Sequence, residues 1–512
     1  MTGTAPNTLI SDHRWSVFVI LLFALLVPGA CRQQTAMVQD DHTAAPELSA
    51  RALRILEVEI RNPTSNAGPT RTPTLTPTLE PSLIATVTPT PTPRTLVVDR
   101  YGKGDYRTIG EAVAEAAAGD LIVVRPGEYR ESVVIGKPIT LQGTGDPQDV
   151  RLIADVGPAL DLQDQVLVEG LRIGCTPAYT GTVIAIGADA EIRGCEIFGY
   201  QLKMPLIRIA DDTRPVLSNN VVAGIGVIGI SIGKRAKPLI EGNDMFQRGS
   251  DEFRAEEDPA SFLGGFWFIR WSDGANPTIR GNRFHDRYGG GLSAGSGARG
   301  LIDNNDFYAG DSPGVSVGGD NVQIHIVSNR FFNHTGNGVL VAGATGQIKI
   351  EGNEFYGMVT PAIAVVDSGE ATIRYNLIHD NWGTGITVRR GARALIEYNE
   401  ISSSGSVGLE VYDDSQATIV GNRMSGGGLC GTKVFSGSQA TFQANEIFDN
   451  EYLGILVDES SEAHIAENHI YGNASYGIVF QNESVGTVSD NTFADNGVQD
   501  VLVQSGLSVE VR

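Results

Sequence analysis

An asparagine that recurs every 23 or 24 residues constrains this 512-residue chain more than any other feature of its sequence. Segments such as ATIRYNLI, ALIEYNEI and ATIVGNRM align on it, and one longer step of 39 residues interrupts the series. The recurring residue is found at Asn220, Asn243, Asn282, Asn305, Asn329, Asn353, Asn376, Asn399, Asn422, Asn445, Asn468 and Asn491. A unit this short cannot bury its own apolar face, so the units must stack on one another to form a core.

Each repeat contains short strands of alternating polarity and no helical period, as in Gly385-Ile386-Thr387-Val388. This pattern predicts an all-β fold, a right-handed single-stranded parallel β-helix. About 14 coils spaced ~4.8 Å apart would make a rod of roughly 65 Å. We expect the asparagines to adopt the left-handed conformation of a tight turn and to form a hydrogen-bonded ladder. The ladder is expected at Asn376, Asn399, Asn422, Asn445 and Asn468.

The start of the repeat region predicts one short helix. Thr108-Ile109-Gly110-Glu111 has the capping-box pattern, the segment AVAEAAA continues it, and Gly119 is expected to end it. We expect this helix to cover the N-terminal end of the rod, where the first coil would otherwise expose its core.

The first 95 residues indicate export and not a folded domain. Residues 15–30 form an apolar run that is short for a membrane span and typical of a secretion signal. The run leads into Val27-Pro28-Gly29-Ala30-Cys31, which resembles the bacterial lipoprotein box, although Pro28 departs from its pattern. Cys31 is therefore the predicted site of lipidation. Thr-Pro repeats follow, and they favour an extended, semi-rigid stalk.

The predicted organisation has three parts. These are a signal peptide with lipobox over residues 1–31, a disordered Thr/Pro-rich stalk over 32–95, and the β-helix over 96–512. We expect an exported protein that is lipid-anchored at the bacterial cell surface, and simple secretion is the alternative.

The net charge limits the partners. The chain has 38 Lys and Arg against 60 Asp and Glu, which gives a net charge of −22. Such a chain repels nucleic acid and anionic lipid, so we expect no nucleic-acid partner and membrane contact only through the lipid anchor. No motif identifies a cofactor or a metal site. A bound Ca²⁺ ion is the alternative to having no cofactor. If the ligand is a polyuronate, this acidic chain would need a bridging cation or a local basic patch to bind it. We expect a monomer.

The stretch DYRTIGEAVAEAAAGDLIVVRPGEYRESVVIGKPITLQG and the later asparagine repeats resemble the pectin-lyase-like β-helix superfamily. This superfamily includes pectin methylesterases and the carbohydrate-binding, sugar-hydrolase (CASH) β-helices, and the resemblance covers residues 96–512. It implies contact with carbohydrate. The catalytic motifs of the methylesterases, pectate lyases and alginate epimerases are not found. Of the four polygalacturonase motifs only Asp-Asp is present, at Asp211-Asp212 and Asp413-Asp414, so the resemblance transfers no catalytic set.

Most charged and aromatic residues have a structural interpretation in this register. One position after the asparagines, opposite charges on successive coils predict an ion-pair ladder. Three positions after them, an aromatic stack is expected at Phe246, His285, Tyr308, Phe332, Tyr356, His379, Phe448 and Tyr471. His285 and His379 belong to this stack, and a general-base role is the alternative.

Three cysteines lie within the repeats. Cys175 and Cys195 fall on neighbouring coils, where a disulfide is one alternative and two buried thiols are the favoured one. Cys430 lies on a distant coil.

The irregular 39-residue step is one candidate binding region. Its extra residues run roughly from Gln247 to Gly264, and Trp267 and Arg270 follow them. A long loop that interrupts a regular rod is typical of a groove or an interface. Trp271 falls in a core slot and is expected to pack.

An outward edge is the second candidate region. It groups Arg389 and Arg390 with Tyr412 and Asp413 of the next coil and Asp367 of the previous one. An anion-binding or catalytic cluster is one interpretation, and a charge ladder through Asp367, Arg390 and Asp413 is the other. Trp382, which falls in a turn, is a further candidate for substrate contact.

These features favour a surface-anchored β-helix protein that binds extracellular polysaccharide without catalysis. The alternative is a polysaccharide lyase, epimerase or glycoside hydrolase that acts on an extended glycan, including a uronate. The catalytic residues of that alternative are not identified.

Overall fold

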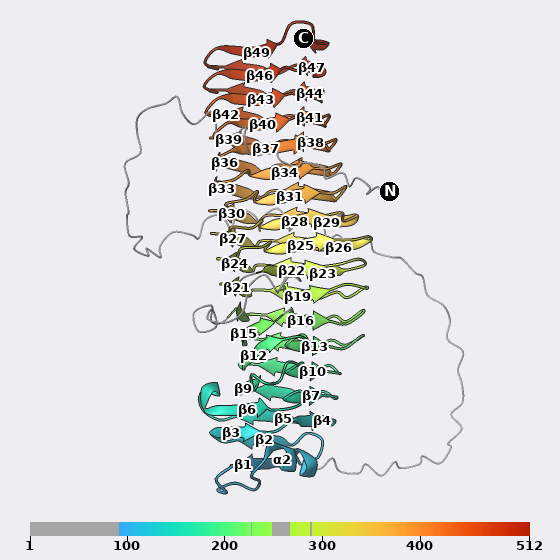
Figure 1. Ribbon diagram of the computed structural model, residues 1–512, viewed down its shortest axis with the longest axis vertical. Helices are drawn as coiled ribbons and strands as arrows, with labels where there is room; N and C mark the ends of the chain where they lie inside the picture. The colour runs from blue at the N-terminus through green and yellow to red at the C-terminus, as the bar shows by residue number, and fades with distance from the viewer. Residues whose placement is uncertain (1–91, 227, 248–266, 287–288) are drawn as a thin grey trace, which may run out of the picture. The chain divides into compact units, whose positions relative to one another are not determined.

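A computed structural model describes residues 92–226, 228–247, 267–286 and 289–512 of the chain. The predicted signal peptide, Cys31, nearly all of the stalk and most of the extra loop of the irregular coil lie outside the described residues. The described chain winds into a parallel β-solenoid (Figure 1). The prediction of an all-β stack of coils is therefore confirmed.

Three parallel sheets form the walls of the solenoid. Sheet A has 18 strands, from β1 (Thr95–Val98) to β50 (Val509–Val511). Sheet B has 16 strands, from β3 (Gly127–Arg130) to β48 (Thr492–Ala494), and sheet C has 16, from β4 (Val133–Ile135) to β49 (Gln499–Val503). The solenoid thus has more coils than the 14 that we expected. The two earliest coils carry Arg125 and Thr144 in the asparagine slot, so the asparagine count misses them.

One coil illustrates the path of the chain. It runs through β32 (Glu370–Arg374) in sheet A, β33 (Leu377–Asn381) in sheet B and β34 (Ile386–Arg389) in sheet C. The next coil repeats this path with β35 (Arg393–Glu397), β36 (Glu400–Ser404) and β37 (Val407–Tyr412). Because the strands pair in parallel register, residues 23 positions apart lie directly above one another.

The core lies inside the three sheets. Alternate side chains point inward, and like residues stack on like along the rod. Phe284, Phe307, Phe331 and Phe355 are fully buried in this way, and their neighbouring ring centroids are 4.7–4.9 Å apart. Such offset aromatic stacks add about 0.5–1.5 kcal/mol per pair beyond the burial of area.

The asparagine ladder is confirmed. The Asn399 Oδ1 accepts hydrogen bonds from the backbone N–H and the Nδ2 of Asn376, at 3.0 and 2.9 Å. The same pattern runs from Asn220 to Asn491. The expected left-handed backbone is wrong for the asparagines themselves, because it falls on the residue before each one, as at Tyr375 with φ of 57°.

The predicted N-terminal helix is present as α2 (Ile109–Glu115), and both hydrogen bonds of its capping box form. It buries Ile109, Ala112 and Val113 against the first strands of the solenoid. The helix ends at Glu115, earlier than expected, because the chain is already extended at Ala116, while Gly119 has a φ of 86° beyond the helix. No helix in the described residues is long and apolar enough to cross a bilayer.

The cysteines of the described residues form no disulfide bond. Cys175, Cys195 and Cys430 are all buried, and the alternative of a Cys175–Cys195 disulfide is wrong. Burial raises the thiol pKa of Cys195 and of Cys430 to about 12.

Candidate functional site

The outward face of sheet B is occupied by the two expected ladders. Aromatic and histidine rings stack from Phe246 to His379 with centroids 4.8–5.4 Å apart. Beside them, Arg330 pairs with Asp306 at 2.7 Å. Both side chains of this pair are partly exposed, so it contributes little to stability.

The histidines are members of the stack, as the register predicts. His285 Nδ1 lies 2.8 Å from Asp286 Oδ2, and its Nε2 lies 2.9 Å from Asp244 Oδ1. Burial opposes protonation of His285, but the hydrogen bonds to Asp244 and Asp286 outweigh it and raise the imidazole pKa. A histidine held at both nitrogens is a poor general base, so these contacts favour the structural role.

The tryptophan and arginine of the irregular coil lie on β19 (Trp267–Trp271) of sheet C. Trp271 is buried, and its Nε1 donates a hydrogen bond to the Arg299 carbonyl at 2.8 Å, so the expected packing role is confirmed. Trp267 is partly exposed and Arg270 is exposed. Sheet C places β19 five strands from β34, which separates them from the second candidate region by about 24 Å.

The second candidate region forms at the corner between sheets C and A. Arg389 Nη1 donates to Tyr412 Oη at 3.1 Å, and Arg390 Nε lies 2.7 Å from Asp367 Oδ1. Among the described residues, Asp413 forms no ion pair with Arg390, so the expected three-member charge ladder is only half formed. Trp382 is 78% exposed in the turn before β34, at the opposite edge of sheet C.

A half-buried carboxylate beside this region was missed by the sequence analysis. Glu410 of β37 accepts a hydrogen bond from Thr387 Oγ1 at 2.8 Å, and burial raises its carboxyl pKa. Lys433 of the next coil lies 4.0 Å from the Phe435 ring centroid. The sequence signal was present, since Thr387, Glu410 and Lys433 are 23 residues apart.

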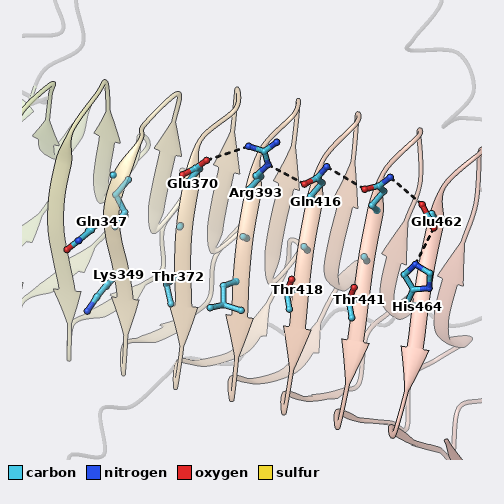
Figure 2. Close-up of a pocket in the computed structure, with 18 residues that line it drawn as sticks. Gln347, Lys349, Glu370, Thr372, Arg393, Gln416, Thr418, Thr441, Glu462 and His464 are labelled. Carbon is cyan, nitrogen blue, oxygen red and sulfur yellow. Dashed lines mark hydrogen bonds and ion pairs between the residues drawn. The ribbon is translucent and has the colours of Figure 1, made fainter. Parts of the chain in front are cut away.

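The outward face of sheet A carries a shallow groove of about 570 Å³ (Figure 2). It crosses six consecutive coils and is lined by β29 (Gly346–Glu351), β32, β35, β38 (Gln416–Val420), β41 (Gln439–Gln443) and β44 (Glu462–Ala466). No residue of this groove was singled out from the sequence. Its signal is the repeated Gln-Ala-Thr of β38 and β41, which sets an alanine between two outward polar residues.

Two rows of outward side chains, all polar except Leu395, border the groove. The first row runs through Glu370, Arg393, Gln416, Gln439 and Glu462, which contact one another at 3.2–3.7 Å (Figure 2). The second row runs through Lys349, Thr372, Leu395, Thr418, Thr441 and His464. The alanines between the rows point inward into the core, so the strand backbone forms the floor of the groove. Two of the six coils, those of β38 and β41, carry only uncharged outward side chains. The other four carry Lys349, Glu370, Arg393, or Glu462 with His464.

The described residues contain no cluster of three or more His, Cys, Asp or Glu side chains that could hold a metal ion. The hydroxyls and amides of the groove can donate and accept hydrogen bonds, which suits a polyhydroxylated ligand.

Residues 206–370 and 361–512 match the family model described as "Right handed beta helix region". Together they cover more than half of the chain. The chain belongs to this right-handed β-helix family. No curated protein matches the sequence of this β-helix chain significantly.

Solved structures with a similar fold include the mannuronan C-5 epimerase AlgE4 A-module of Azotobacter vinelandii. It is 15% identical with a TM-score of 0.34, and the match covers 79% of this chain and 92% of that one. A pectin methylesterase from carrot is 17% identical with a TM-score of 0.32, over 47% and 82% of the two chains. The periplasmic alginate epimerase AlgG is 13% identical with a TM-score of 0.32, over 74% and 76%. At this level of similarity, nothing follows for the activity of the β-helix chain.

Proposed function

We propose that this protein binds an extended polysaccharide along sheet A and does not transform it. The observation that carries the proposal is the open groove over six coils, which is bordered on both sides mainly by hydrogen-bonding side chains. The proposal extends to a protein exported and anchored through a lipid on Cys31, which acts as a monomer.

The repeat of the groove suits a polymer. Successive coils are about 4.8 Å apart, which is similar to the advance per sugar along an extended glycan. Two neighbouring sugars can therefore meet the same Gln and Thr pair, on β38 and β41, and further sugars can meet the side chains of the other coils. Many weak contacts along an open groove can retain a long chain without enclosing it.

The charge pattern favours a neutral glycan. Gln416, Thr418, Gln439 and Thr441 lie on two neighbouring coils of the groove, and they offer hydroxyl and amide groups only. The net charge of −22 repels a polyuronate over the whole chain. A polyuronate would therefore need a bridging cation, so Ca²⁺-dependent binding would accompany that class of ligand.

A glycan panel tests the proposal. The affinity for any glycan that binds is then measured for the wild type, for one groove variant and for one control variant. The double variant Thr418→Arg with Thr441→Arg fills the groove from two exposed positions and leaves the core intact. Thr278→Arg is the control, because Thr278 of β20 (Thr278–Arg280) lies in the same row, three coils before Lys349 and outside the groove. We expect at least about a tenfold loss of affinity in the double variant only. Equal affinity of all three proteins would refute the proposal.

A catalytic function is the alternative, and the half-buried Glu410 favours it. The Glu410 carboxyl group, whose pKa is raised by burial, lies beside Thr387. Arg389 and Tyr412 lie on the same face of sheet C. A carboxyl group with a raised pKa is suited to general acid catalysis on a glycan. Reducing-end and unsaturated-product assays on the retained glycans test it. Turnover by the wild-type chain that is lost in Arg390→Ala would favour a lyase, epimerase or hydrolase over binding alone.

A further inference from the structure

Exposed apolar side chains gather along the corner at which the chain passes from sheet B to sheet C. In five of the seven coils that begin at Asn353, a large apolar residue occupies the sixth or seventh position after the ladder asparagine. These residues form the corner stripe, and each is more than half exposed: Val359, Trp382, Leu429, Tyr452 and Val498. The stripe spans six coil steps, which is about 29 Å along the rod.

The turn at this corner does not require apolar residues. The two preceding coils carry Asp311 and Thr335 at the sixth position. The N–H of Thr335 donates to the Gly310 carbonyl at 2.9 Å, and the N–H of Val359 donates to the His334 carbonyl at the same distance. Polar and apolar residues thus complete the same turn, so the fold does not explain the stripe. Single exposed apolar residues are ordinary, whereas a row of them along one edge is typical of an interaction site.

Half-buried rings and aliphatic groups widen the stripe toward sheet C. Tyr452 is followed by Leu453, the first residue of β43 (Leu453–Val457). Leu453 pairs with Tyr476, the first residue of β46 (Tyr476–Phe480), and both side chains are partly exposed. The stripe is therefore broad enough at Tyr452 to receive a large apolar side chain of a partner.

Carboxylates border the same corner. Asp449 and Glu451 precede Tyr452, Asp495 precedes Val498, and all three acidic residues are exposed. In the described part of the chain, none of these carboxylates forms an ion pair, although Arg423 and His464 pair with other acids nearby in the sequence. The corner segments of the seven coils contain no Lys or Arg. The border of the stripe therefore carries uncompensated negative charge.

The charge decides which occupant fits. A second copy docked about a two-fold axis would bring the same carboxylates face to face, and like charges repel. An anionic lipid surface is repelled for the same reason. A partner with an apolar face bordered by Lys and Arg meets both the stripe and its border. The coil spacing of about 4.8 Å is close to the 5.4 Å pitch of an α-helix, so a helix along the corner presents about one apolar side chain per coil.

We infer that the corner stripe docks a basic amphipathic helix of a partner protein, about 19 residues long. Trp382 and Tyr452 are its anchors, because buried aromatic side chains contribute most to protein interfaces. Asp449, Glu451 and Asp495 pair with the basic residues of the helix. The corner is not part of sheet A, so the inference is independent of glycan binding in the groove, and the two ligands can be bound at once.

The test uses two synthetic peptides of about 19 residues with the same content of Leu and Lys. One has the leucines on a single helical face, and the other has a scrambled order. The full-length protein is measured as wild type, as Trp382→Ser with Tyr452→Ser, and as Tyr101→Ser. Tyr101 is the matched control, because it is 72% exposed near the N-terminal end of the solenoid and outside the stripe. We expect the wild type and the control to bind the amphipathic peptide about tenfold more tightly than the scrambled one, and the double variant to lose that preference.

A charge variant tests the border separately. Asp449→Asn with Glu451→Gln keeps every apolar residue of the stripe, so a several-fold loss of affinity for the Leu/Lys peptide is expected. A peptide with Gln in place of Lys should bind this variant and the wild type equally. All the altered side chains are exposed, so the melting temperatures should not change.

Three results would overturn the inference. They are the absence of a preference for the amphipathic peptide in the wild type, an unchanged preference in the Trp382→Ser, Tyr452→Ser variant, and a loss in that variant of self-association or of binding to phosphatidylcholine vesicles. The last result would assign the stripe to a second copy or to lipid. Glycan affinity should be the same in the wild type and this variant, so a failure of glycan binding refutes the proposed function and leaves the docking inference standing.

Discussion

Removal of one internal rung of the asparagine ladder should destabilise the solenoid strongly. Asn399 is 1% exposed, and its Oδ1 accepts hydrogen bonds from the backbone N–H and Nδ2 of Asn376. Its Nδ2 donates to the Ile373 carbonyl and to Asn422 Oδ1, both at 2.9 Å. Asn399→Ala removes all four contacts at once.

The magnitude follows from the groups that the variant leaves behind. The Asn376 Nδ2 keeps two carbonyl partners, at Ile350 and Arg374. The Asn376 N–H and the Ile373 carbonyl lose their side-chain partner in a dry interior. Each buried group left unsatisfied costs about 1–3 kcal/mol, so the free energy of unfolding should fall by about 4 kcal/mol.

Urea unfolding combined with hydrogen exchange of residues 370–400 measures this loss, because a stacked solenoid can open locally before it unfolds. Asn491→Ala is the control. Asn491 is the last rung and is partly exposed, so water can replace its contacts and the loss should be about half or less. Equal losses in the two variants would refute the view that the ladder stabilises through buried hydrogen bonds.

Three further predictions concern single groups. Burial raises the Glu410 pKa, so the folded chain holds the carboxyl proton more tightly than the unfolded chain does. The free energy of unfolding therefore falls as the pH rises from the pKa of the unfolded chain through that of the folded chain. Glu410→Gln should therefore raise the melting temperature at about pH 7 and not at about pH 3, and a gain at both would contradict this. The thiols of Cys195 and Cys430, with pKa values of about 12, should resist alkylation at about pH 8 until the chain is unfolded, as mass spectrometry would report. Arg390→Ala should change the melting temperature little, because Arg390 and Asp367 are each 50% exposed; a large drop would show a structural role.

The architecture could be predicted because one sequence period carries several independent constraints. A residue at the asparagine slot must satisfy the same turn in every coil, and the inward positions must match the coils above and below. The stacks at His285 and His379 followed from the same register. A second ladder through Asn450, Asn473 and Asn496 was missed, although these residues follow the first ladder by a constant five positions.

The functional surface was harder to predict. Trp267, Arg270, Trp382 and the Arg389 cluster were chosen because they are conspicuous residue types, and sheet C spreads them over separate edges. The groove of sheet A is lined largely by Gln, Ala and Thr, which attract no attention in a sequence.

The sequence by itself determined that this chain stacks into coils, because a 23-residue unit has no other way to bury its apolar side chains. Tertiary structure alone decided which outward surface is open. Neighbouring coils on sheet B fill their outward face with stacked rings and ion pairs, whereas on sheet A the two rows of outward side chains leave a groove between them. Outward side chains either pair with those of the next coil or remain available to a ligand. Which of the two happens depends on contacts between residues 23 positions apart, and only the folded register brings those residues together.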